Sequence, residues 1–108
     1  MNYRIKTKKE KNYLLLKISG NITSSNIHIL AKKLDSLKKS KYNTFVIDLS
    51  ETNYIDSHGL GVLVYSWKMM EKINKSLAFL NPREFVRNIF IGTNLDNMLR
   101  VIDTVEEL

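Results

Sequence analysis

The chain has 108 residues and a formal net charge of +6, with no cysteine, one proline and one tryptophan. This length suits one domain with a single core, and 44% hydrophobic with 26% charged residues is the ordinary balance of a globular domain. The composition excludes a disulfide framework and a thiolate zinc site, and no apolar run reaches the roughly 18 residues of a membrane span. The first residues lack the apolar stretch of a secretion signal, so we expect one cytoplasmic domain over residues 1–108.

Positive charge is concentrated in the first half of the chain. Residues 1–50 hold 11 lysines and arginines against 3 acidic residues, whereas residues 51–108 hold 6 against 8. A basic half suits nucleic acid, an anionic lipid surface or an acidic protein partner, and a solvated lysine surface also explains it. The charge alone therefore selects no partner.

Two alternating runs open the chain. The run from Tyr3 to Lys8 alternates its faces, and the run from Tyr13 to Ile18 does the same. The polar tract of residues 9–12 between them is short enough for a turn. These runs predict a β-hairpin.

The rest of the chain alternates helices with strands. Hydrophobic periodicity and capping residues predict the following elements: a helix from Ser24 or Ser25 to about residue 39, a buried strand over 44–49, a helix over about 57–74, a strand over 76–80, a helix that Asn81 and Pro82 open and that runs to about residue 90, a strand over 99–102, and a short helical start at Thr104. The order ββαβαβαβ predicts an α/β fold, with a mixed sheet of a hairpin and parallel strands packed with helices.

Two helices allow more detailed predictions. The helix over 57–74 is apolar on nearly every side, which indicates deep burial or contact with a partner. In the helix that ends near residue 90, Phe85, Val86, Ile89 and Phe90 are predicted to face the core, and Gly92 suits the turn that follows.

The segment around Asp56 and Ser57 is unusual. A buried strand leads through a polar loop to a helix N-terminus, where free backbone N–H groups and the positive end of the helix dipole favour an anion. The simplest interpretation is that Asp56 or Ser57 caps the helix. Gly59 and Gly61 weaken the first turn, which indicates that another surface approaches the backbone closely. A phosphate on Ser57 could be stabilised by the same N–H groups.

These residues resemble the signature of the STAS domain family, and more closely that of the bacterial anti-sigma factor antagonists (anti-anti-sigma factors). The resemblance covers nearly the whole chain. The similar segments are Gly20-Asn21-Ile22, residues 45–50, the stretch Tyr54-Ile55-Asp56-Ser57-His58-Gly59-Leu60-Gly61-Val62-Leu63, and residues 86–90 and 95–98.

The resemblance implies a phosphoswitch. In the family, the serine after the aspartate is phosphorylated by an anti-sigma factor that is also a serine kinase, and here that serine is Ser57. The unphosphorylated protein binds the kinase and releases a sigma factor, whereas the phosphorylated form lets go and a serine phosphatase resets it. This chain would be neither an enzyme nor a holder of cofactors, because ATP and magnesium belong to the partner kinase.

The resemblance also implies a partner-binding surface and an oligomeric state. The surface would comprise Thr23, Ser24, Ser25, Asp56, Ser57, His58, Gly59 and Leu60. His58 stands where the family usually has a small residue, and Thr23 stands where many members have an aspartate. The free protein is expected to be a monomer that binds neither nucleic acid nor membrane.

Other functions fit parts of the sequence. A STAS module could bind a partner without a phosphoswitch, in a signalling scaffold or a lipid-transport assembly. A polyanion-binding protein could use the basic first half. An enzyme has the least support, because the two histidines, His28 and His58, lie far apart in sequence and no metal-ligand spacing or nucleotide-binding glycine pattern is present.

Overall fold

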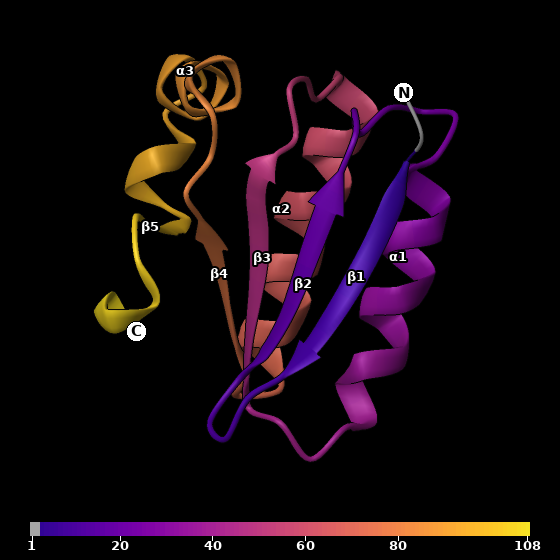
Figure 1. Ribbon diagram of the computed structural model, residues 1–108, viewed down its shortest axis with the longest axis vertical. Coiled ribbons are helices and arrows are strands. Elements are labelled where there is room, and N and C mark those ends of the chain that lie inside the picture. The colour runs from indigo at the N-terminus through magenta and orange to yellow at the C-terminus, as the bar shows by residue number, and fades with distance from the viewer. Residues whose placement is uncertain (1–2) are drawn as a thin grey trace.

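The strands form one mixed five-stranded sheet. The computed structural model describes residues 3–108, and in it the strand order is β1-β2-β3-β4-β5. β1 and β2 are antiparallel, and the remaining neighbours are parallel (Figure 1). The strands are β1 (Arg4–Lys9), β2 (Leu14–Ser19), β3 (Thr44–Glu51), β4 (Ser76–Leu80) and β5 (Arg100–Ile102). The predicted α/β fold is confirmed.

Three α-helices connect the parallel strands. α1 and α2 lie behind the sheet in Figure 1 and contact each other, whereas α3 lies beyond the upper end of β4. None of the helices in residues 3–108 combines the length and apolarity of a membrane span. The helices are α1 (Ile27–Ser36), α2 (Ser57–Lys72) and α3 (Glu84–Gly92), with short 3-10 helices η1 (Leu37–Lys39), η2 (Leu95–Asn97) and η3 (Val105–Glu107).

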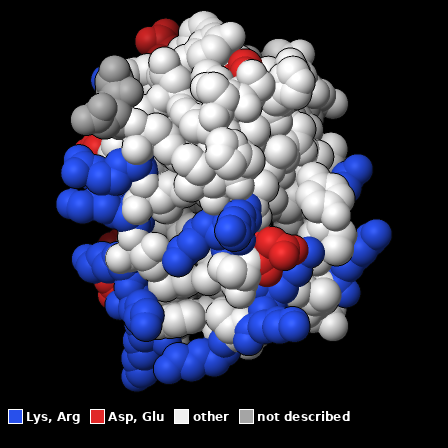
Figure 2. Space-filling view, turned by 90° about the vertical axis from the view of Figure 1, so that its right-hand side faces the viewer, with Lys and Arg blue, Asp and Glu red and all other residues white. Residues whose placement is uncertain are grey.

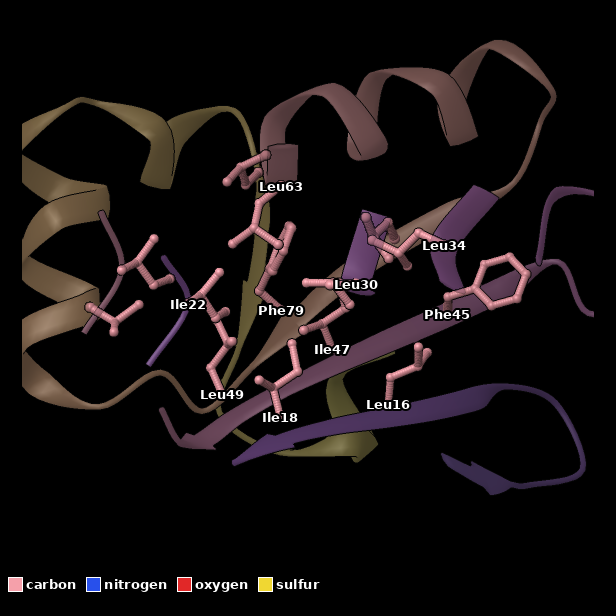
Figure 3. Close-up of a cluster of buried hydrophobic side chains, with 14 of the residues drawn as sticks. Leu16, Ile18, Ile22, Leu30, Leu34, Phe45, Ile47, Leu49, Leu63 and Phe79 are labelled. Carbon is pink, nitrogen blue, oxygen red and sulfur yellow. The ribbon is translucent and has the colours of Figure 1, made fainter. Parts of the chain in front are cut away.

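The core lies between the sheet and helices α1 and α2. Leu16 and Ile18 of β2 are fully buried and point toward the helices, in one cluster with Leu34 of α1 and Leu63 of α2 (Figure 3). Alternate residues of β2 are buried, as the period of a strand with one covered face requires. Most of β3 is buried on both faces, as its continuous apolar run predicts for a central strand.

Helix α2 is apolar beyond the side that faces the core. Leu63 and Met70 are buried, and Trp67 is half-buried against the core. Tyr65, however, is 61% exposed. The broad apolar surface predicted for this helix is therefore present, and part of it faces solvent.

The prediction that Ser24 or Ser25 caps the first helix is wrong. Asn26 is the residue that flanks α1. The backbone N–H of Ser24 instead donates to the Asp56 carboxylate at 2.8 Å. The N–H of Ser24 therefore has a partner distant in the sequence, and α1 begins at Ile27, two residues later than a Ser24 cap predicts and one later than a Ser25 cap predicts.

The predicted start of α3 is also wrong. Asn81 adopts a left-handed φ of 49°, and its N–H donates to the Ile102 carbonyl at 2.7 Å, so it extends the sheet toward β5. The helix begins only at Glu84. Phe85, in the first turn of this helix, is 50% exposed, contrary to the prediction, whereas Val86 is buried as predicted.

The end of α3 differs from the prediction as well. Gly92 is the last helical residue, and Asn94 takes the left-handed conformation, with a φ of 62°. Asparagine is among the residues that adopt this conformation most readily after glycine. The predicted helical start at Thr104 is confirmed as the capping box of η3.

The amine of Lys75 fixes the connection into β3. This side chain is nearly buried, and its Nζ donates to the carbonyl oxygens of Ser40 at 2.7 Å and Tyr42 at 2.6 Å. The Nζ also lies 5.6 Å from the centroid of the Phe45 ring. The two hydrogen bonds compensate for removing the charge from water.

Replacing Lys75 with methionine keeps most of the packing but removes both donors. We expect Lys75→Met to lower the free energy of unfolding by about 2 kcal/mol, because two carbonyl oxygens lose their partner. Urea unfolding measures this change. Lys72→Met, at the exposed end of α2, is the control and should change stability by less than about 0.5 kcal/mol; equal effects would show that the buried hydrogen bonds contribute nothing.

Candidate functional site

The predicted phosphorylation segment lies at the end of the sheet to which β2, β3 and β4 point. In Figure 1 this is the upper end, where α1 and α2 begin. Asp56 has an extended backbone and is the N-cap of α2, and Ser57 is the first residue of that helix. Sites in α/β proteins typically form at the carboxyl ends of the strands, because loops and helix N-termini gather there.

The Asp56 carboxylate joins two connections of the chain. One oxygen, Oδ1, accepts from the backbone N–H of Gly59 at 2.9 Å, which closes the first turn of α2. The other oxygen, Oδ2, accepts from the backbone N–H of Ser24 at 2.8 Å, in the connection between β2 and α1. The connection that carries Thr23 and Ser25 is thereby held beside the start of α2.

The same hydrogen bonds set the charge state of Asp56. The N–H of Gly59, and to a smaller extent that of Ser24, holds the pKa of this carboxyl below its usual range, because both donors stabilise the carboxylate. Desolvation opposes this effect, and the neighbouring His58 lowers the pKa further by a smaller amount. Asp56 is therefore ionised at neutral pH.

The segment after β2 is hydrogen-bonded to the residues that lead into α2. The N–H of Ile22 donates to the Tyr54 carbonyl at 2.9 Å, and the N–H of Asp56 donates to the Ile22 carbonyl at 3.0 Å. Gly59 packs on the same residue: a Cβ atom at Gly59 would lie 2.7 Å from Ile22 Cγ2 and 3.0 Å from its carbonyl oxygen. The surface that approaches Gly59 closely is therefore part of this chain.

Ser57 and His58 are exposed at the helix N-terminus. The N–H of Leu60 makes a helical bond to the Asp56 carbonyl at 2.9 Å, so the N–H groups of Ser57 and His58 precede the helical ladder. Such N–H groups, together with the helix dipole, favour a negative charge at this position.

An apolar groove begins beside Ser57. It lies between α1 and α2, has a volume of about 510 Å³, and includes Leu34, Tyr65 and Met69 in its lining. Gly61 also lines it, and a Cβ atom there would meet nothing within 4 Å. The second glycine of the motif thus faces open space, unlike Gly59.

Comparisons with known proteins identify the family of this chain. A model of the STAS domain matches residues 4–108. The chain belongs to the STAS domain family. The anti-sigma-B factor antagonist of Bacillus subtilis is 30% identical to it over 101 residues, which are 94% of this chain and 92% of that protein.

Solved structures of STAS proteins are also similar. A Thermotoga maritima protein that carries the name anti-sigma factor antagonist has a TM-score of 0.87 at 28% identity, covering 95% of this chain and 89% of its own. The anti-sigma factor antagonist SpoIIAA, in its unphosphorylated form, has a TM-score of 0.73 at 15% identity, covering 98% and 92%. The second likeness concerns the fold alone.

The residues predicted to form the partner surface lie in the connection between β2 and α1 and at the start of α2, which Asp56 joins. Thr23 is half-buried, and its Oγ1 lies 2.8 Å from Ser25 Oγ. Ser24 is exposed, and Asp56 and Leu60 are partly exposed. Gly59 is buried and packs on Ile22, so most of its surface is covered by this chain.

Metal ligands do not gather in this STAS domain. No group of three or more His, Cys, Asp or Glu side chains within residues 3–108 is placed to hold an ion. His28 and His58 are exposed on different helices.

Beside the site lies an aromatic pair that the sequence did not predict. Tyr54 and Phe85 are 42% and 50% exposed, and their ring centroids lie 5.3 Å apart. Tyr54 precedes Asp56 in the loop, whereas Phe85 stands in the first turn of α3. Only the tertiary fold brings them together, and no local pattern indicates the pair.

The two glycines of the motif should respond in opposite ways to alanine. We expect Gly59→Ala to lower the free energy of unfolding by about 1–3 kcal/mol, since Ile22 would have to shift. Gly61→Ala should raise it by about 0.5–1 kcal/mol, because the added methyl group meets no atom and alanine favours the helix. Urea unfolding measures both free-energy changes. Changes of the same sign in the two variants would contradict the close contact at Gly59 and the open space at Gly61.

Asp56→Asn should lower the melting temperature at neutral pH. An amide has one acceptor oxygen, so the N–H of either Gly59 or Ser24 loses its partner. Because folding lowers the pKa of Asp56, the stability it contributes is full at neutral pH and is lost as pH falls through the folded-state pKa. The difference between wild type and variant should therefore shrink in acid. Asp96→Asn, at an exposed carboxylate, is the control and should show no such pH-dependent difference in melting temperature.

Proposed function

We propose that this protein is a cytoplasmic anti-sigma factor antagonist controlled by phosphorylation of Ser57. The unphosphorylated form would bind an anti-sigma factor serine kinase and free a sigma factor. The observation that carries this proposal is the exposed Ser57 at the start of α2, on a surface that Asp56 joins to residues 23–25. The names of the similar proteins support the general role.

Ser57 would act as the phosphoryl acceptor. Its Oγ would form a bond to the γ-phosphorus of ATP held by the kinase, the bond from that phosphorus to the leaving ADP oxygen would break, and the hydroxyl proton would pass to a base of the kinase. Asp56 is poorly placed to be that base, because both its oxygens already accept backbone N–H groups. This chain would therefore position the acceptor hydroxyl, and the kinase would supply the catalytic groups, ATP and magnesium.

The phosphate would have opposite effects on the folded chain and on the complex. It adds roughly −1.5 to −2 charge, which the N–H groups of Ser57 and His58 and the helix dipole stabilise. At the centre of a contact surface the same charge costs a few kcal/mol in desolvation and repulsion, which lowers affinity about a hundredfold or more. The fold would persist while the complex dissociates.

A protein of similar fold supports this proposal. SpoIIAA has been solved in unphosphorylated and phosphorylated forms, and each form has a fold similar to this chain, with TM-scores of 0.73 and 0.74. A serine phosphatase would reach Ser57 as readily as the kinase, because the residue is exposed in the free domain. We propose that the free protein is a monomer and that it binds neither nucleic acid nor membrane in this role.

Incubation with the cognate kinase and ATP should place phosphate on Ser57, as mass spectrometry would locate it. Ser57→Asp should weaken kinase binding by about 1 kcal/mol or more, because it adds a charge to the contact surface, whereas Ser57→Ala should bind whether or not ATP is supplied. Calorimetry measures both affinities.

Asn12→Asp is the matched control, since it adds the same charge in the turn between β1 and β2, at the opposite end of the sheet (Figure 1). It should leave kinase affinity unchanged. Phosphate on another residue would refute Ser57 as the site. Equal kinase affinities of Ser57→Asp and Ser57→Ala would instead indicate a STAS module that binds its partner without a phosphoswitch. A specific complex with nucleic acid at physiological salt would instead support the polyanion-binding function.

A further inference from the structure

The sheet ends in a strand with a free edge. β1 pairs with β2 on one side and, within residues 3–108, with no strand on the other. Five of its six residues are exposed, and Ile5 is half-buried. The outward N–H and C=O groups of an edge strand can pair with an added strand from another molecule.

The helix behind this edge extends past it. Figure 1 shows α1 behind β1 and projecting beyond it, on the side away from β2. Ile5 and Thr7 of β1 share a groove of about 600 Å³ with His28 and Ile29 of α1. Ile29 is 48% exposed in this groove. A strand added to β1 would lie over α1 and cover Ile29.

Like charges face each other on the opposite side of β1. The register places Lys6 directly across from Lys17, on the same face of the sheet. Such a pair is destabilising unless an anion lies between the two charges. Lys17 has an ion pair with Glu51 at 3.0 Å, and Lys8 has one with Glu10 at 3.2 Å. Lys6 is left without a counter-charge among residues 3–108.

Further unpaired cations surround the edge. Figure 2 faces the side of β1 and α1 and shows lysines and arginines gathered over the lower part, whereas the upper part is mostly uncharged. Within residues 3–108, the cations of β1 and of the groove that form no ion pair are Arg4, Lys6, Lys9, Lys32 and Lys33. The free edge is therefore strongly positive on both of its faces.

We propose that β1 accepts an acidic, extended segment of a partner protein as a sixth strand. Side chains of a strand alternate between two faces, so apolar residues of the segment would cover Ile5 and Ile29, and acidic residues would lie beside Arg4 and Lys6. Lysines on an edge prevent indiscriminate pairing, and here they make the edge selective for negative charge. This surface does not include Ser57, so the proposal stands apart from the phosphoswitch.

The other occupants fit less well. A second copy of the chain that paired through its own β1 would bring two sets of lysines together, which like-charge repulsion opposes. A nucleic acid would satisfy the lysines, but it has no strand backbone to pair with the edge, and it leaves the apolar contact of Ile29 unused.

A fluorescent peptide that alternates glutamate and valine over about ten residues tests the proposal by anisotropy. We expect the peptide to bind, and its affinity to fall as salt is raised from about 0.05 to 0.5 M. Bound peptide should also slow the hydrogen exchange of alternate β1 amides. Lys6→Glu should weaken binding about tenfold, and so should Ile29→Glu. The matched controls, Lys68→Glu on α2 and Ile91→Glu on α3, should change it less than about twofold.

Several results would overturn this assignment. These are equal binding of a peptide with lysine in place of glutamate, unchanged exchange of the β1 amides, or equal effects of the test and control variants. Sedimentation that revealed a dimer broken by Lys6→Glu or Ile29→Glu would assign the edge to a second copy instead. An RNA oligonucleotide that bound through Lys6 and protected no β1 amide would assign it to nucleic acid.

Discussion

The first turn of α2 packs against the segment that follows β2. A carboxylate accepts hydrogen bonds from both, and a glycine leaves room for the close contact. Asp56 accepts from both sides of this junction, and Gly59 lets the helix approach Ile22 to a distance that any Cβ atom would prevent. The orientation of the helix, and with it the position of Ser57, follows from these two contacts. The core beneath them adds stability, but it does not by itself decide which backbone atoms meet at the upper end of the sheet.

In the free domain the residue 23–25 connection is already hydrogen-bonded to the start of α2. The conformational entropy of residues 23–25 is lost when the domain folds, so a partner need not order this connection on binding. Under the proposed function, a charge added at Ser57 would act by local electrostatics, without a rearrangement of the sheet. The basic edge at β1 belongs to a different part of the molecule, and the two surfaces can be occupied independently. Figure 2 shows lysines and arginines gathered over the lower part of the side that carries β1 and α1, whereas α2 begins at the upper end of the sheet (Figure 1).

The order of the elements was predictable from sequence because each strand and helix carries its own period. Alternate burial in β2 and the buried run in β3 follow directly from the side chains of those segments. The ends of helices were less predictable, because distant hydrogen bonds decide them: Ser24 donates to Asp56, and Asn81 donates to the carbonyl of Ile102. Within the site, the motif indicated Ser57 and a close approach at Gly59, but no local signal could tell that the approaching surface is the chain's own.

The lone tryptophan of the chain gives this arrangement an optical consequence. Trp67 lies half-buried in α2, the helix that begins with Ser57, and packs against the core, so indole emission reports on the contact between this helix and the core. Fluorescence would follow the solvation of that helix, whereas circular dichroism averages over the whole backbone. Coincidence of the two signals during denaturation would then indicate that α2 and the sheet unfold as a single cooperative unit.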